Sequence, residues 1–211
     1  MELYPNMNQS NTALMIIDVI NSCADEKFET PKWGIHFSKI RSMVPSLAKF
    51  IKEIRERVSS PIIFVTTTPW TKKNLTENIN ELYTDPRAEY YSDDISGFAE
   101  KFYQIEPEIS DLVITKNHYD AFTNKQLNEY LENKKIKYII AAGIFGDGCV
   151  LATICGAFSK GYNFVILDDL IETTDLPERQ QILTGLKQYT WPAMYGKTLK
   201  SNEFLKLFAN N

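Results

Sequence analysis

Residues 138–170 read YIIAAGIFGDGCVLATICGAFSKGYNFVILDDL, and this stretch decides the fold. An apolar run of strand length at 138–142 leads into a turn with three glycines, then a helical pattern, then a second apolar run at 164–167. Two strands joined through a helix run in the same direction in a sheet. The stretch therefore predicts one strand–helix–strand unit of an α/β fold.

The rest of the chain continues this alternation. Further apolar runs of strand length lie at 13–17, 62–67 and 112–115. Helical patterns lie at 40–58, at 124–131 and from Pro177 onward. We therefore expect the α/β fold class, with a mainly parallel sheet and helices on both faces in a three-layer, Rossmann-like arrangement.

Length and composition limit the class of protein. The 211 residues are expected to form a single domain over 1–211, with an irregular excursion at about 68–110 that is too long for a plain connector. The formal net charge of -4 offers no broad cationic surface, so we expect no nucleic acid among the partners. The polar N-terminus does not resemble a secretory signal and the apolar runs are strand-sized, so we expect no membrane partner and a cytoplasmic location.

The cysteines and histidines form no metal-binding or disulfide pattern. Cys23, Cys149 and Cys155 make an odd count without framework spacing, which suits a reducing compartment. His36 and His118 lie far apart and in no metal-ligand spacing. The glycines of GIFGDG do not match a dinucleotide fingerprint, and a phosphate-binding Lys-Ser/Thr pair is missing. We therefore expect no metal and no cofactor.

Cys149 stands where a helix is predicted to begin. Asp147 is a good N-cap residue, which would place the cysteine in the first turn of that helix. Unpaired N–H groups and the helix dipole favour a thiolate there, so we expect a lowered pKa and a nucleophile near neutral pH. The alternative is a buried small hydrophobic side chain, which is how we interpret Cys155. Cys23 is a rival nucleophile, but no helix start supports it, so we expect it to be a pocket-lining or buried thiol.

Two further chemical groups follow predicted strands. Asp18 ends the run at 13–17 and Lys116 ends the run at 112–115, and parallel strands present their carboxyl ends at one edge of a sheet. A carboxylate beside a thiol can act as general base, and an ammonium between them favours both anions. Backbone amides of the glycine-rich turn would face the developing oxyanion. This predicts acyl transfer to Cys149 followed by hydrolysis; the alternative for Asp18 is a carboxylate that turns the chain back to solvent.

Three motifs taken together have a family resemblance. They are Asp18, the segment KNHYDAF that begins at Lys116, and GIFGDGCVLATICGAFSKGY before VILDDL. Their spacing resembles the isochorismatase-like cysteine hydrolase family, which includes nicotinamidases and N-carbamoylsarcosine amidases. The resemblance implies that Asp18 is the base, Lys116 the orienting cation and Cys149 the nucleophile.

The same resemblance implies features of the turn and of the assembly. Ile144-Phe145 would align with the family's cis peptide, and the amides of Phe145 and Cys149 with its oxyanion hole. The family also implies a homo-oligomer, either a dimer or a tetramer.

The chain departs from the family pattern in two places, and a third feature narrows the activity. Members often carry Gln two residues and Phe five residues after the first-strand aspartate, whereas this chain has Ile20 and Cys23, so we expect a different pocket. Nicotinamidases place an Asp and histidines after the second strand to bind a metal, whereas residues 66–70 read TTTPW, which disfavours nicotinamidase activity. Isochorismatases proper often lack the cysteine, because vinyl-ether hydrolysis needs no thiol, so Cys149 favours an amidase-like member.

The sequence therefore predicts a cysteine-dependent hydrolase acting on a small amide, carbamoyl or related acyl substrate through a thioester intermediate. The alternatives are an isochorismatase-type vinyl-ether hydrolase and a catalytically silent member that binds a small molecule or a partner protein. A phosphatase loop is disfavoured because its Arg position, six residues after Cys149, is Cys155. Residues 191–194, WPAM, are expected to close the site or an interface. The expected pocket wall consists of Cys23, Trp33, Trp70, His118, Tyr119 and Phe145. The alternative for the last five residues is a packing role without substrate contact.

Overall fold

The computed structural model describes residues 2–29, 35–71, 73–82 and 101–208. These residues form a six-stranded sheet in which every neighbouring pair is parallel, in the order β3-β2-β1-β4-β5-β6. The strands are β1 (Thr12–Ile17), β2 (Ile62–Thr67), β3 (Leu112–Lys116), β4 (Tyr138–Gly143), β5 (Asn163–Ile171) and β6 (Gly196–Leu199).

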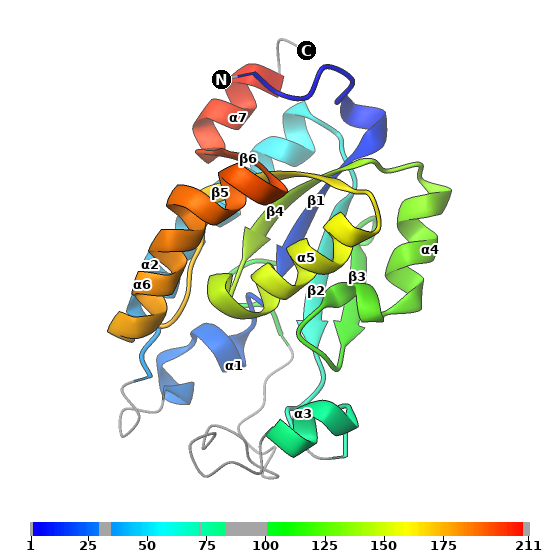
Figure 1. The fold of residues 1–211 in the computed structure, drawn as a ribbon. Coiled ribbons are helices and arrows are strands. Elements are labelled where there is room, and N and C mark those ends of the chain that lie inside the picture. Colours follow the sequence, from blue (N-terminus) through cyan, green and yellow to red (C-terminus); the bar gives the residue numbers. More distant parts are fainter. Residues whose placement is uncertain (1, 30–34, 72, 83–100, 209–211) are drawn as a thin grey trace.

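Helices cover both faces of the sheet (Figure 1). Alternate side chains of β1 enter two different cores, with Leu14 and Ile16 in one and Met15 and Ile17 in the other. The first core holds α2 (Ser38–Arg57) and α7 (Ser201–Phe208), and the second holds α4 (Lys125–Asn133), α5 (Leu151–Ser159) and α6 (Pro177–Gly185). The predicted three-layer α/β fold class is confirmed.

Shorter elements lie between these helices and strands. Figure 1 shows α1 (Asn21–Ala24) and α3 (Glu77–Leu82) beyond the carboxyl ends of the strands, at the opposite end of the molecule from α7. The remaining short turns of 3-10 or π type are η1 (Gln9–Asn11), η2 (Glu26–Phe28), η4 (Ala121–Thr123), η5 (Gly146–Val150) and η6 (Leu186–Tyr195). In the described part of the chain, no helix has both the length and the apolar character needed to cross a bilayer.

The described part of the excursion at about 68–110 returns to the first strand. Ile20 forms an antiparallel bridge with Phe102. The N–H of Asn21 donates to Lys101 O at 2.9 Å and that of Tyr103 donates to Val19 O at 2.9 Å. The excursion therefore ends against the segment that directly follows β1, while its residues 72 and 83–100 lie outside the described residues.

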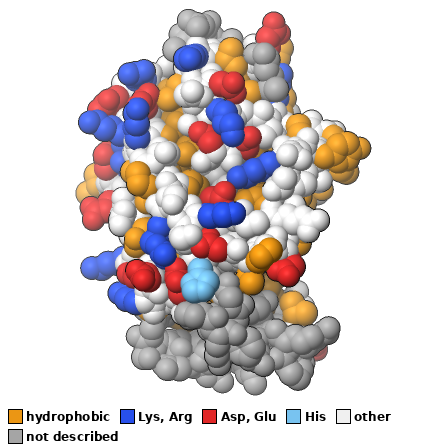
Figure 2. Space-filling model, turned by 90° about the vertical axis from the view of Figure 1, so that its left-hand side faces the viewer, with side chains coloured by type: hydrophobic (Ala, Val, Ile, Leu, Met, Phe, Trp, Pro, Cys, Tyr) orange, Lys and Arg blue, Asp and Glu red, His pale blue; other side chains and the backbone are white. Residues whose placement is uncertain are grey.

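The face seen in Figure 2 has no large area of one charge. Lysine and arginine side chains are mixed with aspartate and glutamate side chains over this face. Two adjacent ion pairs, Lys52 with Glu56 and Arg57 with Glu53, show the same mixing along α2.

Gly143 is the last residue of β4 and lies opposite Ile17, the last residue of β1. Its φ is 123°, a conformation that residues with a Cβ rarely adopt. A Cβ at this position would lie 2.2 Å from Ile17 O. The next amide, that of Ile144, donates to the same Ile17 O at 2.8 Å. Gly143 thus lets β4 continue directly into the turn beside the end of β1.

We predict that Gly143→Ala costs about 3 kcal/mol or more of unfolding free energy, because strained φ and backbone overlap add together. Urea denaturation followed by circular dichroism measures the loss. Gly185→Ala is the matched control, because a Cβ there meets nothing within 4 Å. This control should be neutral or stabilising by up to about 1 kcal/mol, since glycine is a poor helix former. Equal stabilities of the two variants would contradict the role given to Gly143.

Candidate active site

Three chemical side chains meet at the carboxyl edge of the sheet. Asp18 directly follows β1, Lys116 is the last residue of β3, and Cys149 lies in η5 after β4. Lys116 Nζ is 2.7 Å from Asp18 Oδ2 and 3.3 Å from Cys149 Sγ. All three residues are buried, with relative exposures of 2% for Asp18, 2% for Lys116 and 8% for Cys149. The structure therefore brings together the three residues that the sequence singled out.

The strand order explains why a long side chain such as lysine is needed here. In the order β3-β2-β1, strand β2 lies between the strand that carries Lys116 and the strand that precedes Asp18. The lysine side chain spans this gap, while its own carbonyl is held by Thr68 N at 2.9 Å and Thr67 Oγ1 at 3.2 Å. Its ammonium also lies 5.8 Å from the centre of the Trp70 ring.

Asp18 adopts an uncommon backbone conformation. Its φ is 54°, in the left-handed region that Asp tolerates better than most residues. Its N–H donates to Val65 O at 2.9 Å, and its carbonyl accepts from Ile20 N at 2.8 Å. Among the described residues, its buried Oδ1 has no hydrogen-bond partner. One oxygen of the carboxylate therefore binds the ammonium, and the other is free to accept a proton.

The buried Asp18 carboxylate stabilises the ammonium form of Lys116. Burial alone would lower the pKa of Lys116, but the charge of Asp18 and the hydrogen bonds to Asp18 and Cys149 outweigh burial and raise it. Lys116 is therefore charged throughout the physiological pH range.

Cys149 does not have the lowered pKa that the sequence predicted. Burial raises the pKa of its thiol, the Lys116 ammonium lowers it, and the Asp18 carboxylate raises it again, so that the net shift is upward. The resting sulfur is therefore a thiol at neutral pH. It needs a base to become a nucleophile.

The prediction that Asp147 caps the helix is also wrong. Phe145 occupies the N-cap position, and no side chain caps the turn. Gly148 has φ -126° and ψ -106°, so the chain is not helical just before Cys149. The Asp147 carboxylate instead pairs with Arg179 and accepts from Thr173. Sequence reasoning gave no role to Arg179 or Thr173.

The turn itself has the predicted cis peptide, between Ile144 and Phe145. The carbonyl of Phe145 accepts from Gly148 N at 2.9 Å and from Val150 N at 3.1 Å. The Phe145 N–H donates to no backbone carbonyl within the described part of the chain. An amide without a backbone partner therefore lies in the same turn as the sulfur of Cys149.

Aromatic side chains lie beside Lys116 and in the turn that carries Cys149. Trp70 packs on Tyr119 with ring centroids 5.6 Å apart, and Tyr119 packs on His118 at 5.8 Å. The Phe145 ring lies 6.3 Å from Phe37. Trp70 links the rings of Tyr119 and His118 to the ammonium of Lys116. The predicted wall residue Trp33 lies outside the described residues.

Cys23 lies close enough to the site for the charges of the site to affect its pKa. Burial and the Asp18 charge raise the pKa of Cys23, and the hydrogen bond to Ser22 and the charges of Lys116 and Arg179 lower it, so that the net pKa is about 12. Cys23 is therefore a neutral thiol beside the site. Among the described residues, no group of three or more His, Cys, Asp and Glu side chains could hold a metal ion.

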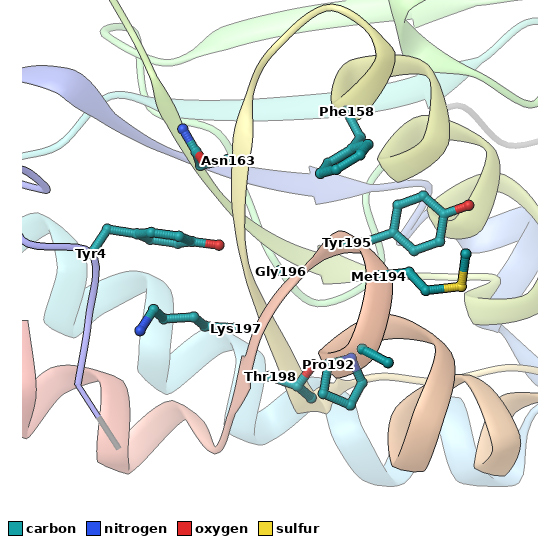
Figure 3. Close-up of a pocket in the computed structure, with 10 residues that line it drawn as sticks. Tyr4, Phe158, Asn163, Pro192, Met194, Tyr195, Gly196, Lys197 and Thr198 are labelled. Atoms are coloured by element: carbon teal, nitrogen blue, oxygen red, sulfur yellow. The ribbon is translucent and has the colours of Figure 1, made fainter.

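A surface pocket of about 380 Å³ lies at the other end of the sheet (Figure 3). Asn163 and Gly196, the first residues of β5 and β6, line it, so it belongs to the amino ends of the strands. Trp191 is fully buried in the second core, and residues 192–194 line this pocket. The segment 191–194 therefore does not close the site around Cys149.

Comparisons with known proteins agree with this geometry. The family model for the isochorismatase domain matches residues 12–196. The chain is 27% identical to the uncharacterised isochorismatase family protein YaaI of Bacillus subtilis, over 86% of this chain and 91% of that protein. It is 23% identical to the secreted isochorismatase effector Isc1 of Verticillium dahliae, over 79% and 75% of the two chains. It is 36% identical to the ureidoacrylate amidohydrolase RutB of Yersinia enterocolitica, over 31% and 29%.

Solved structures share the fold. A cysteine hydrolase from Pseudomonas syringae superposes with a TM-score of 0.79 at 16% identity, covering 100% of this chain and 98% of that one. The N-carbamoylsarcosine amidase of Thermoplasma acidophilum superposes with a TM-score of 0.65 at 20% identity, covering 93% and 98%.

We predict that alkylation of Cys149 by iodoacetamide keeps accelerating by about tenfold per pH unit between about pH 7 and about pH 9. The raised pKa of Cys149 means that its thiolate fraction still grows in proportion to hydroxide over this range. Peptide mass spectrometry at timed points measures the rate. A rate that levels off below about pH 8 would show a lowered pKa and contradict the structure.

We predict that Lys116→Met destabilises the fold by about 3–5 kcal/mol, because it leaves the Asp18 carboxylate buried without its ion-pair partner. Urea denaturation measures the change. The double variant Asp18→Asn with Lys116→Met should recover most of the loss, since no buried charge remains unpaired. Lys52→Met, whose ion pair is exposed, is the control and should change stability little. A double variant less stable than the single one would contradict this account.

Proposed function

Since this chain belongs to the isochorismatase family of hydrolases, we propose that it is a cysteine hydrolase that cleaves the C–N bond of a small amide, carbamoyl or related acyl substrate. The observation that carries the proposal is the buried contact of Lys116 Nζ with Asp18 Oδ2 at 2.7 Å and with Cys149 Sγ at 3.3 Å. A thiol, a carboxylate and an ammonium in contact form a nucleophile, a base and an orienting cation.

In the first step, Asp18 accepts the proton of the Cys149 thiol as the sulfur attacks the substrate carbonyl. Asp18 Oδ1, which has no other partner among the described residues, is the oxygen suited to this role. Lys116 stays charged, because its pKa is raised, and so stabilises the thiolate as it forms. Asp18 is needed as a base because burial raises the pKa of the Cys149 thiol, which therefore keeps its proton at neutral pH.

The attack produces a tetrahedral intermediate with a negatively charged oxygen. The N–H groups of Phe145 and Cys149, in the turn after β4, are the donors that we assign to it. Collapse of the intermediate breaks the C–N bond, and the protonated Asp18 returns its proton to the leaving nitrogen. A thioester on Cys149 remains.

Water completes the cycle. Asp18, again a carboxylate, takes a proton from a water molecule that attacks the thioester carbonyl. The second tetrahedral intermediate uses the same amides and expels the sulfur, which regains its proton from Asp18. A carboxylic acid, or a carbamic acid from a carbamoyl substrate, leaves the site.

Relatives support both this reaction and one alternative. RutB is named as a ureidoacrylate amidohydrolase, and the Thermoplasma structure as an N-carbamoylsarcosine amidase, so amide hydrolysis occurs on this fold. Isc1 is named as an isochorismatase effector, which makes vinyl-ether hydrolysis the second candidate. The buried sulfur beside Asp18 and Lys116 favours the amidase, because vinyl-ether hydrolysis has no use for a thiol.

We predict that Cys149→Ala lowers amide hydrolysis by about 10⁴-fold or more, because it removes the nucleophile. The measurement is ammonia release from a panel of short aliphatic amides, ureido acids and N-carbamoyl amino acids, with circular dichroism to verify the fold. Cys155→Ala is the matched control and should keep the wild-type rate, because Cys155 lies outside the contact of the three residues.

The same panel decides between the candidates. Ammonia release that survives Cys149→Ala would mean that Cys149 is not the nucleophile. Hydrolysis of isochorismate in a separate assay, by both wild type and Cys149→Ala and without turnover of any amide, would favour the vinyl-ether reaction instead.

A further inference from the structure

We propose that Arg179 is a positioning residue that holds the turn carrying Cys149 and the oxyanion amides in its reactive geometry. The inference rests on the proposed function and adds to it a residue that lies thirty positions after the nucleophile, in the first turn of α6.

The main contact of Arg179 is a two-pronged ion pair with Asp147. Arg179 Nε lies 2.7 Å from Asp147 Oδ2, and Arg179 Nη2 lies 2.8 Å from Asp147 Oδ1. Thr173 Oγ1 donates to the same Oδ1 at 2.5 Å. The Asp147 side chain is 7% exposed, so its carboxylate is fixed inside the protein. A paired fork of this kind restricts orientation as well as distance.

The same guanidinium also packs on the ring of Phe145, whose centre lies 4.8 Å from the guanidinium carbon. It lies beside Gly148 as well, because Arg179 Nη2 is 3.8 Å from the position that a Cβ on this glycine would occupy. One side chain of α6 therefore contacts Phe145 and Asp147, which precede Cys149 by four and two residues.

Helix α6 supports the backbone of the turn between these contacts. A Cβ on Gly146 would lie 2.4 Å from Leu183 Cδ1 and 3.0 Å from Ile171 Cγ2, so this glycine is pressed against the helix and β5. Leu183 follows Arg179 by four residues and lies on the same face of α6. The Gly146 N–H also donates to Glu172 O at 2.9 Å.

The turn needs this support because its own sequence does little to restrict its backbone conformation. Gly146 and Gly148 leave its backbone free to adopt many conformations. The amides of Phe145 and Cys149 must point at one oxygen for acyl transfer, and a misplacement of about 1 Å can cost about 100-fold in rate. Alkylation of the sulfur forms no oxyanion and does not depend on these amides.

The test compares two reactions of the same sulfur. Acylation of Cys149 by p-nitrophenyl acetate, followed by nitrophenol release, passes through an oxyanion, whereas alkylation by iodoacetamide does not. Both rates are measured on wild type, Arg179→Ala and Arg179→Lys, with modification of Cys149 verified by peptide mass spectrometry. We expect Arg179→Ala to slow acylation by about 100-fold while alkylation changes by less than about threefold. The acylation rate of Arg179→Lys should lie between those of wild type and Arg179→Ala, because lysine keeps the charge but cannot form the two-pronged ion pair.

Arg55→Ala is the matched control. Arg55 of α2 pairs with Asp111, just before β3, at side-chain exposures of 23% and 6%, close to the 28% and 7% of Arg179 and Asp147. That pair lies at the amino ends of the strands, away from the site, so its loss should lower the melting temperature without changing the ratio of acylation to alkylation.

Two results would overturn the inference about Arg179 and leave the proposed function standing. One is acylation of Arg179→Ala at the wild-type rate. The other is an equal fall of both reactions in Arg179→Ala, which would show a merely structural role. Wild-type Cys149 that is alkylated and never acylated would instead overturn the proposed function, and with it the role of Arg179.

Discussion

A buried ammonium needs an anionic partner, and this requirement organises the carboxyl end of the sheet. Lys116 has no exposed side-chain surface, and its Nζ contacts one carboxylate oxygen and one sulfur. Removing such a charge from water costs several kcal/mol, which a close opposite charge can offset. The left-handed conformation of Asp18 brings its carboxylate to the ammonium, and the position of Cys149 after β4 adds a neutral sulfur as a hydrogen-bond acceptor. The stability of this end of the sheet and the chemistry that we propose for it therefore depend on the same contact.

The turn after β4 is held from two sides. On the side of the sheet, Gly143 lets the chain pass Ile17 O closely enough for the next amide to bond to it. On the other side, Arg179 and Leu183 of α6 press against the turn. Between these supports the backbone follows a path that is neither strand nor helix at Gly148. A flexible, glycine-rich sequence thus acquires one conformation from its neighbours.

The central strands and the three site residues could be predicted from sequence, because uninterrupted apolar runs mark buried strands and Asp18, Lys116 and Cys149 stand at or just after their ends. The role of Asp147 could not be predicted from sequence. Its carboxylate can either cap the helix start or pair with Arg179 of α6, and the sequence does not show which of the two it does. The direction of the pKa shift of Cys149 could not be predicted either, since the local turn favours the thiolate whereas burial opposes it. Strand β6 could not be predicted, because GKTL is short and has only one buried residue.

The described ends of the excursion after β2 have a consequence for divergence within the family. The N–H of Thr68 is fastened to Lys116 O on the outgoing side, and the N–H of Tyr103 to Val19 O on the returning side. Both hydrogen bonds join main chain to main chain, so neither depends on the side chain of Thr68 or Tyr103. Substitutions at these two positions can therefore leave the two ends of the excursion in place beside Lys116 and the segment after Asp18.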